Sequence, residues 1–145
     1  MASVFDDSYT YLNSSIRTYV NAKSTLDKLF AIKLIVLSMI VAADALIEKL
    51  GRLSDTSFQS HMEESSLFLP MAAYEQRITD IYSLEERGLI PSQFEFSRRL
   101  RTALDTLKII HGQYSLRSLL AINIKEFINE SQFFIIDIQT LLEKK

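Results

Sequence analysis

The uncharged run between Lys33 and Asp44 constrains the fold of this chain more than any other feature. A membrane-spanning helix needs about 20 apolar residues, whereas this run has ten. On a helical wheel Lys33, Asp44 and Glu48 share one narrow side, and apolar side chains cover nearly all the rest. We therefore predict a core helix from about Thr25 to Leu50, surrounded by protein, and no membrane span.

The composition describes one domain of ordinary size, spanning residues 1–145. There is no cysteine, which excludes disulfides, thiolate metal sites and thiol catalysis. Sixteen basic and eighteen acidic residues give a net charge of −2, so we expect no strong attraction to nucleic acid or anionic lipid. A hydrophobic fraction of 48% is high for a small soluble protein and indicates that an oligomer or a partner covers some apolar surface.

The first residues, MASVFDDSYTYLN, contain neither the basic stretch nor the apolar stretch of a secretory signal. The absence of cysteine also fits a reducing compartment. We therefore expect a cytoplasmic protein.

Glycine and proline divide the chain into helical segments. The three glycines, Gly51, Gly88 and Gly112, each follow a helical pattern, at the position where a left-handed residue closes a helix. A proline three residues after Gly88 prevents continuation. The next helix is predicted to begin with an S-x-x-E capping box made by Ser92 and Glu95.

Apolar residues recur at helical spacing along most of the chain, and no strand pattern is present. The predicted helices cover residues 7–23, 25–50, 70–87, 93–111 and 116 to the end. Ser24 and Asp27 form a candidate cap between the first two segments, but Asp7 to Leu50 could also form one bent helix. Within residues 51–69 the pattern is weakest, and Asp55 is a candidate start of a short helix. We predict an all-α, antiparallel bundle of four long helices, with room for one extra short helix.

Each predicted helix has an apolar face for the core. These faces consist of Leu12, Ile16, Tyr19 and Val20; of Met71, Tyr74, Ile78 and Ile81; and of Phe96, Leu100, Ala103, Leu104 and Leu107. The last helix follows 4-3 spacing through Leu120, Ile124, Phe127, Ser131, Phe134, Ile138 and Leu141.

Several apolar residues exceed what this bundle needs for its own core. They are Leu37, Ile40 and Val41 beside the polar side of the core helix, Phe68 and Leu69 before a proline, and a second stripe on the last helix, Leu119, Ile122, Phe133 and Ile136. Either they pack internally or they bind a second protein surface. We predict an interface formed by the second stripe, with Phe68 and Leu69 as a further contribution.

A basic cluster, Arg98, Arg99 and Arg101, lies on the fourth predicted helix. Three arginines on a nearly neutral protein do not favour specific nucleic-acid binding. We expect them to form surface ion pairs or to steer an acidic protein partner to the interface.

No combination of residues points to catalysis, a metal ion or a cofactor. The two histidines, His61 and His111, lack the Glu-x-x-His pattern of bundle metal sites. No serine lies in G-x-S-x-G, and no glycine-rich loop precedes a lysine. We therefore assign no catalytic, metal-binding or cofactor-binding residue.

The stretch TLKIIHGQY, residues 106–114, resembles the histidine motif of the HEPN helical-bundle ribonucleases. In that family an arginine precedes the histidine by a few residues, and two subunits bring both side chains into a dimer cleft that cleaves RNA. The resemblance implies a site around His111. This sequence departs from the motif, because Thr106 or Leu107 stands where the arginine is expected and Arg101 is ten residues upstream. The departure implies a degenerate, inactive relative.

The sequence thus favours a non-enzymatic protein–protein interaction or assembly module, which associates with itself or joins a larger complex. One alternative is the degenerate HEPN-like protein, with His111 near a dimer cleft. Another is a small-molecule sensor with an apolar pocket between its helices. Burial of His111 among leucines in a monomer would exclude the first alternative, and an internal cavity would favour the second.

Overall fold

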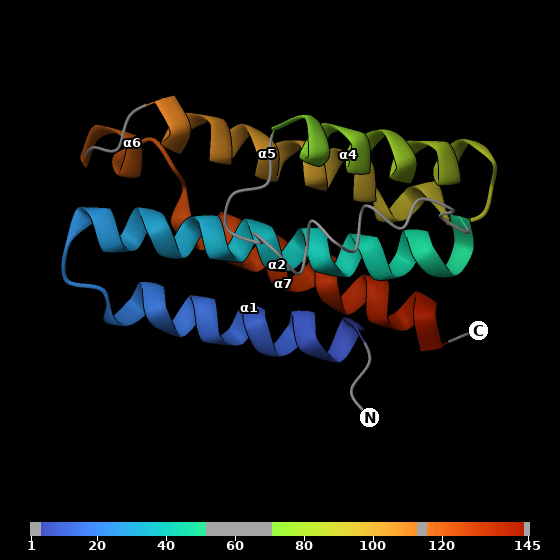
Figure 1. Cartoon of the computed structure of the whole chain (residues 1–145), viewed down its shortest axis with the longest axis horizontal. Helices are drawn as coiled ribbons and strands as arrows, with labels where there is room; N and C mark the ends of the chain where they lie inside the picture. The colour runs from blue at the N-terminus through green and yellow to red at the C-terminus, as the bar shows by residue number, and fades with distance from the viewer. Residues whose placement is uncertain (1–3, 52–70, 113–115, 144–145) are drawn as a thin grey trace.

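The computed structural model describes residues 4–51, 71–112 and 116–143 (Figure 1). These residues form the helices α1 (Val4–Asn21), α2 (Thr25–Gly51), α4 (Met71–Glu86), α5 (Phe96–Gly112), α6 (Leu116–Leu120) and α7 (Ile124–Glu143), with a 3-10 turn at Ser92–Phe94. No strand occurs among them. The predicted all-α bundle is therefore confirmed. The short helix expected near Asp55 lies outside the described residues.

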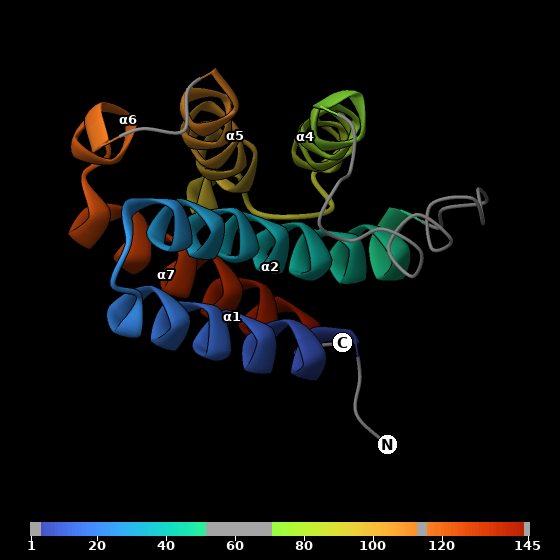
Figure 2. The same ribbon diagram turned by 60° about the vertical axis from the view of Figure 1, so that its left-hand side comes forward.

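Helix α2 is the centre of the bundle. It lies between a layer formed by α4, α5 and α6 and a layer formed by α1 and α7 (Figures 1 and 2), and it packs against all five. Leu37 and Ile40, expected near the outer side of this helix, are instead buried, because neighbouring helices cover that side too. By length and composition Thr25–Leu50 is the one described helix that could cross a membrane, and 72% of its most apolar stretch is buried inside the protein.

The first two helices are separate, so five helices in the described part of the chain have 16 residues or more. Ser24 ends the connection as predicted, since its hydroxyl accepts a hydrogen bond of 3.1 Å from the Asp27 amide. Lys28 then reaches back to α1. Its ammonium donates to the Tyr19 carbonyl at 3.2 Å and lies 4.5 Å from the centre of the Tyr19 ring. A cation at the end of α1 thus stabilises the turn without glycine or proline.

The direction of the helices follows from their connections. The short turns after α1 and α4 make α1 antiparallel to α2, and α4 antiparallel to α5 (Figure 1). Helices α2, α4 and α7 run in the same direction (Figure 1). The bundle therefore combines antiparallel hairpins with parallel neighbours around α2.

Gly88 ends α4 as the sequence predicts. It is left-handed, with φ of 74°, and the Leu89 amide donates to the Leu84 carbonyl at 3.0 Å, which is the hydrogen bond of a Schellman motif. The predicted capping box at Ser92 is wrong, because Ser92 begins the 3-10 turn instead. Glu95 is itself left-handed, with φ of 52°, and α5 begins at the next residue.

The last helical segment is broken in two, where one continuous helix was predicted. Asn123 caps α7: its side-chain oxygen accepts from the Glu126 amide at 3.3 Å, and its side-chain amide donates to the Glu126 carboxylate at 3.2 Å. Leu120, expected at the start of the core stripe, is consequently 76% exposed. The break redirects the chain and removes Leu120 from the core.

Most predicted core faces are confirmed. The buried residues of α4 and α5 include Tyr74, Ile78, Ile81, Phe96, Leu100, Ala103, Leu104 and Leu107. Besides Leu120, Val20 is an exception, with 66% of its surface exposed at the end of α1. Buried serines are satisfied within their own helices: the Ser131 hydroxyl, for example, donates to the Ile128 carbonyl at 2.8 Å.

Candidate functional site

Helix α7 has one face fixed in the core. Its buried residues are Phe127, Ser131, Phe134, Ile135 and Ile138. The Phe134 ring meets the Phe96 ring of α5 edge to face, with 5.5 Å between centres. Because α1, α2 and α5 hold this face, the rotation of α7 about its axis is determined and its opposite face points to solvent.

The opposite face carries what we call the outer stripe of α7. It consists of the exposed residues Glu126, Asn129, Phe133, Ile136, Thr140 and Glu143, which alternate at spacings of three and four. Phe133 is 56% exposed and Ile136 is 41% exposed. Two large apolar side chains, one turn apart, thus lie at the centre of a polar stripe.

The structure divides the predicted interface residues. Phe133 and Ile136 lie together on the outer stripe, whereas Leu119 and Ile122 precede α7 and are half-buried against the core. Phe68 and Leu69 lie outside the described residues. The exposed part of the second apolar stripe is therefore confined to α7 itself.

The predicted arginine cluster is distributed over three sets of ion pairs. Arg98 pairs with Glu95 on the surface. The Arg101 guanidinium and the Lys108 ammonium both reach the Glu75 carboxylate of α4, at 3.5 and 3.2 Å, and the hydrogen bond from Lys108 is the main reason that the Glu75 pKa is lowered. Arg101 and Lys108 thus connect α5 to α4. None of these ion pairs includes a residue of the outer stripe of α7.

Arg99 is the one member of the cluster that adjoins the outer stripe. Its Nη1 lies 2.8 Å from Asp137 Oδ2, and its Nε lies 3.8 Å from Glu130 Oε2. Glu130 and Asp137 lie one turn before and one turn after Phe133 on α7. Arg99 therefore balances two carboxylates that flank the exposed aromatic ring.

A shallow hollow of about 310 Å³ runs along the first half of the outer stripe. It is bordered by Asn123, Lys125, Glu126, Asn129, Glu130 and Phe133. It is open to solvent, so it suits the side chains of an opposing surface better than an enclosed small molecule.

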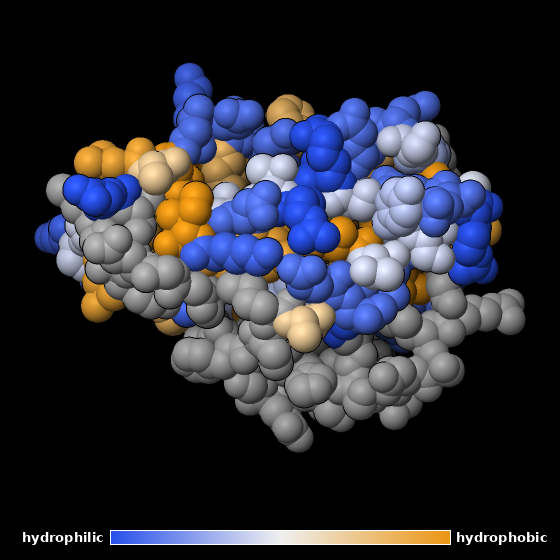
Figure 3. Space-filling view, turned by 90° about the horizontal axis from the view of Figure 1, so that it is seen from above, coloured by the Kyte–Doolittle hydropathy of each residue, from blue (hydrophilic) through white to orange (hydrophobic). Residues whose placement is uncertain are grey.

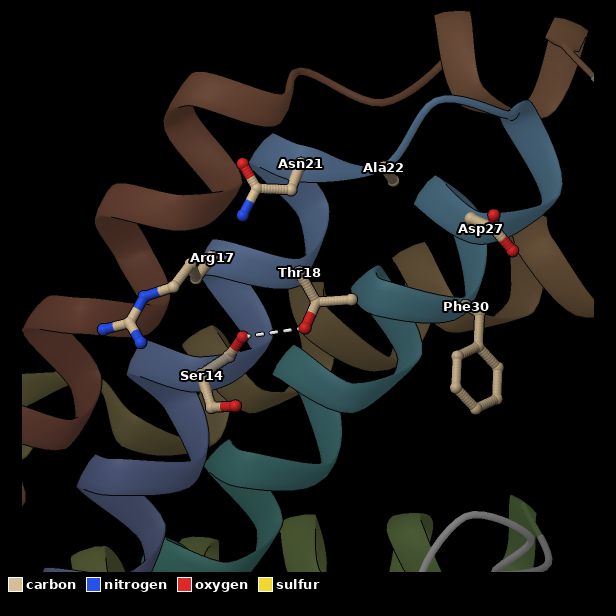
Figure 4. A pocket seen from close by; sticks show the side chains of 7 residues that line it. All are labelled: Ser14, Arg17, Thr18, Asn21, Ala22, Asp27 and Phe30. Atoms are coloured by element: carbon tan, nitrogen blue, oxygen red, sulfur yellow. Dashed lines mark hydrogen bonds between the residues drawn. The ribbon is translucent and has the colours of Figure 1, made fainter.

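A second hollow of about 430 Å³ lies between α1 and α2 (Figure 4). The Thr18 hydroxyl within it donates to the Ser14 carbonyl of its own helix at 2.9 Å. Arg17 and Phe30, its one basic residue and its one aromatic residue, point away from each other (Figure 4). The side chains thus do not converge on a common point, as a binding site requires.

The apolar surface on the other side of the molecule is at the α6 end. Figure 3 looks onto the layer of α4, α5 and α6, where hydrophilic side chains cover the middle and hydrophobic ones gather at the end that carries α6. Leu120 of α6 is 76% exposed. Helix α7 lies on the other side of α2 from this layer (Figure 2).

One buried polar pair was not anticipated from the sequence. Arg77 of α4 donates from Nε to Asp44 Oδ1 of α2 at 3.0 Å, and both side chains are more than nine-tenths buried. The second carboxylate oxygen of Asp44 bonds to no described residue. Burial raises the pKa of Asp44 to about 8; Arg77 opposes this rise, and Asp80 and Glu48 add to it.

A sequence signal for this pair did exist. Arg77 lies three residues after Tyr74 and four before Ile81, so it shares the helical face of two buried residues. Asp44 is the first charge after the uncharged run of α2. Their separation of 33 residues hid the contact.

The described residues contain no group of three or more His, Asp or Glu side chains that could hold a metal ion. The side chains of His61 and His111 lie outside the described residues, so the HEPN-like alternative stays a hypothesis. Leu100, Leu104 and Leu107, which share the helical face of His111, are buried.

The chain matches no protein-family model, no curated protein and no solved structure. Its candidate site is therefore described by its own chemistry alone.

Proposed function

We propose that this protein is a non-enzymatic assembly module that associates with itself through the outer stripe of α7. The observation that carries the proposal is the exposure of Phe133 and Ile136 on a helix whose opposite face is fully packed. Complete burial of such a side chain contributes about 1.5–3 kcal/mol. Covering the two therefore favours association.

The surroundings of these two residues support a protein partner. Asn129 and Thr140 continue the stripe with uncharged polar groups, and Glu126 and Glu143 lie at its ends. An apolar centre with a polar and then a charged rim is the usual anatomy of a protein–protein interface. Arg99 already pairs with Glu130 and Asp137, the carboxylates that flank Phe133. Removing water from the apolar centre of the stripe therefore costs little solvation of these charges.

Light scattering coupled to size exclusion tests the proposal, with samples from about 10 μM to about 1 mM to cover a weak interface. The wild-type mass should rise above 16.7 kDa with concentration, and Phe133→Asp should remain a monomer throughout. Tyr82→Asp is the matched control, since Tyr82 is an exposed aromatic residue on α4. A wild-type monomer over the whole range would reject the proposal.

A further inference from the structure

We infer that the α6 end of the bundle is a second interaction surface, which docks on anionic lipid at a membrane surface. The α6 end comprises residues 17–28, around the turn between α1 and α2, and residues 116–126, from α6 to the start of α7. Helix α6 packs against α2 and lies at the same end of the bundle as that turn (Figures 1 and 2). This surface shares only Glu126 with the outer stripe of α7, so it goes beyond the proposed function.

The most exposed aliphatic side chains of the described residues lie at this end. Leu120 of α6 is 76% exposed, Val20 at the end of α1 is 66% exposed, and Leu26 at the start of α2 is 60% exposed. Each of them is more exposed than Phe133. Because they belong to three separate helices, their exposure is not simply the outer face of one amphipathic helix.

Basic residues accompany these aliphatic side chains. The α6 end has five basic and two acidic residues, a net charge of +3, whereas the whole chain has −2. The basic residues are Arg17, Lys23, Lys28, Arg117 and Lys125, and the acidic ones are Asp27 and Glu126. The rest of the chain therefore carries −5. The even overall balance, which predicted no strong attraction to anionic lipid, conceals this uneven distribution.

The cations of the α6 end are not neutralised by nearby carboxylates. Every ion pair between described residues uses an arginine or lysine of α4 or α5. Lys28 donates instead to an uncharged group, the Tyr19 carbonyl. The other four basic side chains of the α6 end are exposed and form no ion pair with a described residue. Their positive charge is therefore available to an anionic partner.

The arrangement of these groups fits a lipid surface better than a folded protein. Helices α1 and α6 belong to layers on opposite sides of α2, so the exposed side chains are spread across the bundle (Figure 2). A protein partner would need a matching shape at each of them, whereas a fluid bilayer adapts to separate side chains. Exposed aliphatic groups beside lysine and arginine are typical of proteins that lie in the membrane interface.

The contact is peripheral, because the apolar stretch of α2 stays inside the protein. Aliphatic side chains of the α6 end enter the boundary between head groups and acyl chains, and the cations meet lipid phosphates and carboxylates. Cytoplasmic faces of membranes carry such anionic lipids, and each lysine or arginine near them strengthens binding about fivefold. Salt weakens this attraction by screening it.

Tryptophan fluorescence with lipid vesicles tests the inference, because the chain has no tryptophan. Leu120→Trp places a single fluorophore at the α6 end, and Tyr82→Trp is the matched control at an exposed aromatic residue of α4. The vesicles consist of phosphatidylcholine alone or with roughly one third phosphatidylserine. The emission of Leu120→Trp should shift to shorter wavelength with the anionic vesicles only. The emission of Tyr82→Trp should not shift with either.

Sedimentation with the same vesicles measures what individual side chains contribute. Val20→Asp and Leu26→Asp should each lower the partition coefficient onto anionic vesicles by about tenfold or more, because an aliphatic group no longer enters the interface. Lys23→Gln should lower it about fivefold through the lost charge. Tyr82→Asp should bind as the wild type does.

Several results would overturn the inference: no binding to anionic vesicles, equal binding to both vesicle types, or substitutions at the α6 end that change binding no more than Tyr82→Asp. Binding of soluble polyglutamate in place of anionic vesicles would overturn it in favour of an acidic protein partner. The proposed function would stand in each case, because it depends on Phe133 and Ile136.

Discussion

Helices α2 and α7 both carry apolar residues on more than one side, yet their surroundings differ. Five helices surround α2, and its side chains from Ile35 to Ile40 are buried. Three helices hold α7, and Phe133 and Ile136 remain at the surface. Whether an apolar side chain is buried or exposed therefore depends on how many helices surround its own helix. The predictions below test that distinction.

The largest effect is expected from placing a carboxylate on each helix. Ile40→Asp buries a charge in α2 and should lower the free energy of unfolding by more than about 4 kcal/mol. Ile136→Asp should change it by less than about 1 kcal/mol, because that side chain already contacts water. Urea denaturation of dilute samples measures both. Equal losses would mean that α7 is as enclosed as α2.

A smaller change in the free energy of unfolding is expected from the titration of Asp44, the buried carboxyl group of α2. Folded Asp44 has a pKa of about 8, against an ordinary value of 3.8, so between these values the folded state binds more protons than the unfolded state. The Asp44 contribution to stability is thus complete below about pH 4 and is lost as the pH rises through 8. Each pKa unit corresponds to about 1.4 kcal/mol, so the loss is on the order of a few kcal/mol.

Asp44→Asn isolates this contribution from those of the other carboxylates. The asparagine resembles the protonated carboxyl group, so at pH 5 the variant should have nearly the stability of the wild type. At pH 9 it should be the more stable of the two, by denaturant unfolding at each pH. If the free energies of unfolding of the two proteins changed equally between pH 5 and pH 9, Asp44 would have an ordinary pKa.

The side-chain cap at the beginning of α7 should contribute less to the free energy of unfolding. Asn123→Ala removes the side chain that caps this helix and should cost about 1 kcal/mol in the free energy of unfolding. Because the cap also fixes where the outer stripe begins, self-association should weaken as well. Ser24→Ala, which removes the cap of α2, is the matched control and should affect stability alone.

The smallest effect is expected at the flank of the outer stripe. Arg99→Gln leaves Glu130 and Asp137 unbalanced, so the dimer should dissociate several-fold more readily, equivalent to about 1 kcal/mol. Added salt should restore most of the affinity, because it screens repulsion between the carboxylates. Arg98→Gln, whose partner Glu95 is distant from α7 in the chain, should behave as the wild type. Identical salt dependence in both variants would contradict the role given to Arg99.

Some boundaries could be predicted because their causes are local. The left-handed Gly88 and the Ser24 cap depend on residues within one turn, and both are confirmed. The break before α7 has an equally local cause, the side-chain cap that Asn123 forms with Glu126, but the regular 4-3 spacing across it concealed the signal. At Ser92 the same type of motif predicted a helix that begins only at Phe96.

The sequence by itself determined that the chain is helical and which side chains share each helical face, because periodicity depends only on residues a few positions apart. The tertiary structure decided which of those faces are covered. Ile40 is buried and Phe133 is exposed although both belong to apolar stripes. Asp44 finds Arg77 across 33 residues of chain. Burial and pairing depend on helices that are distant in the sequence, and packing alone brings those helices together.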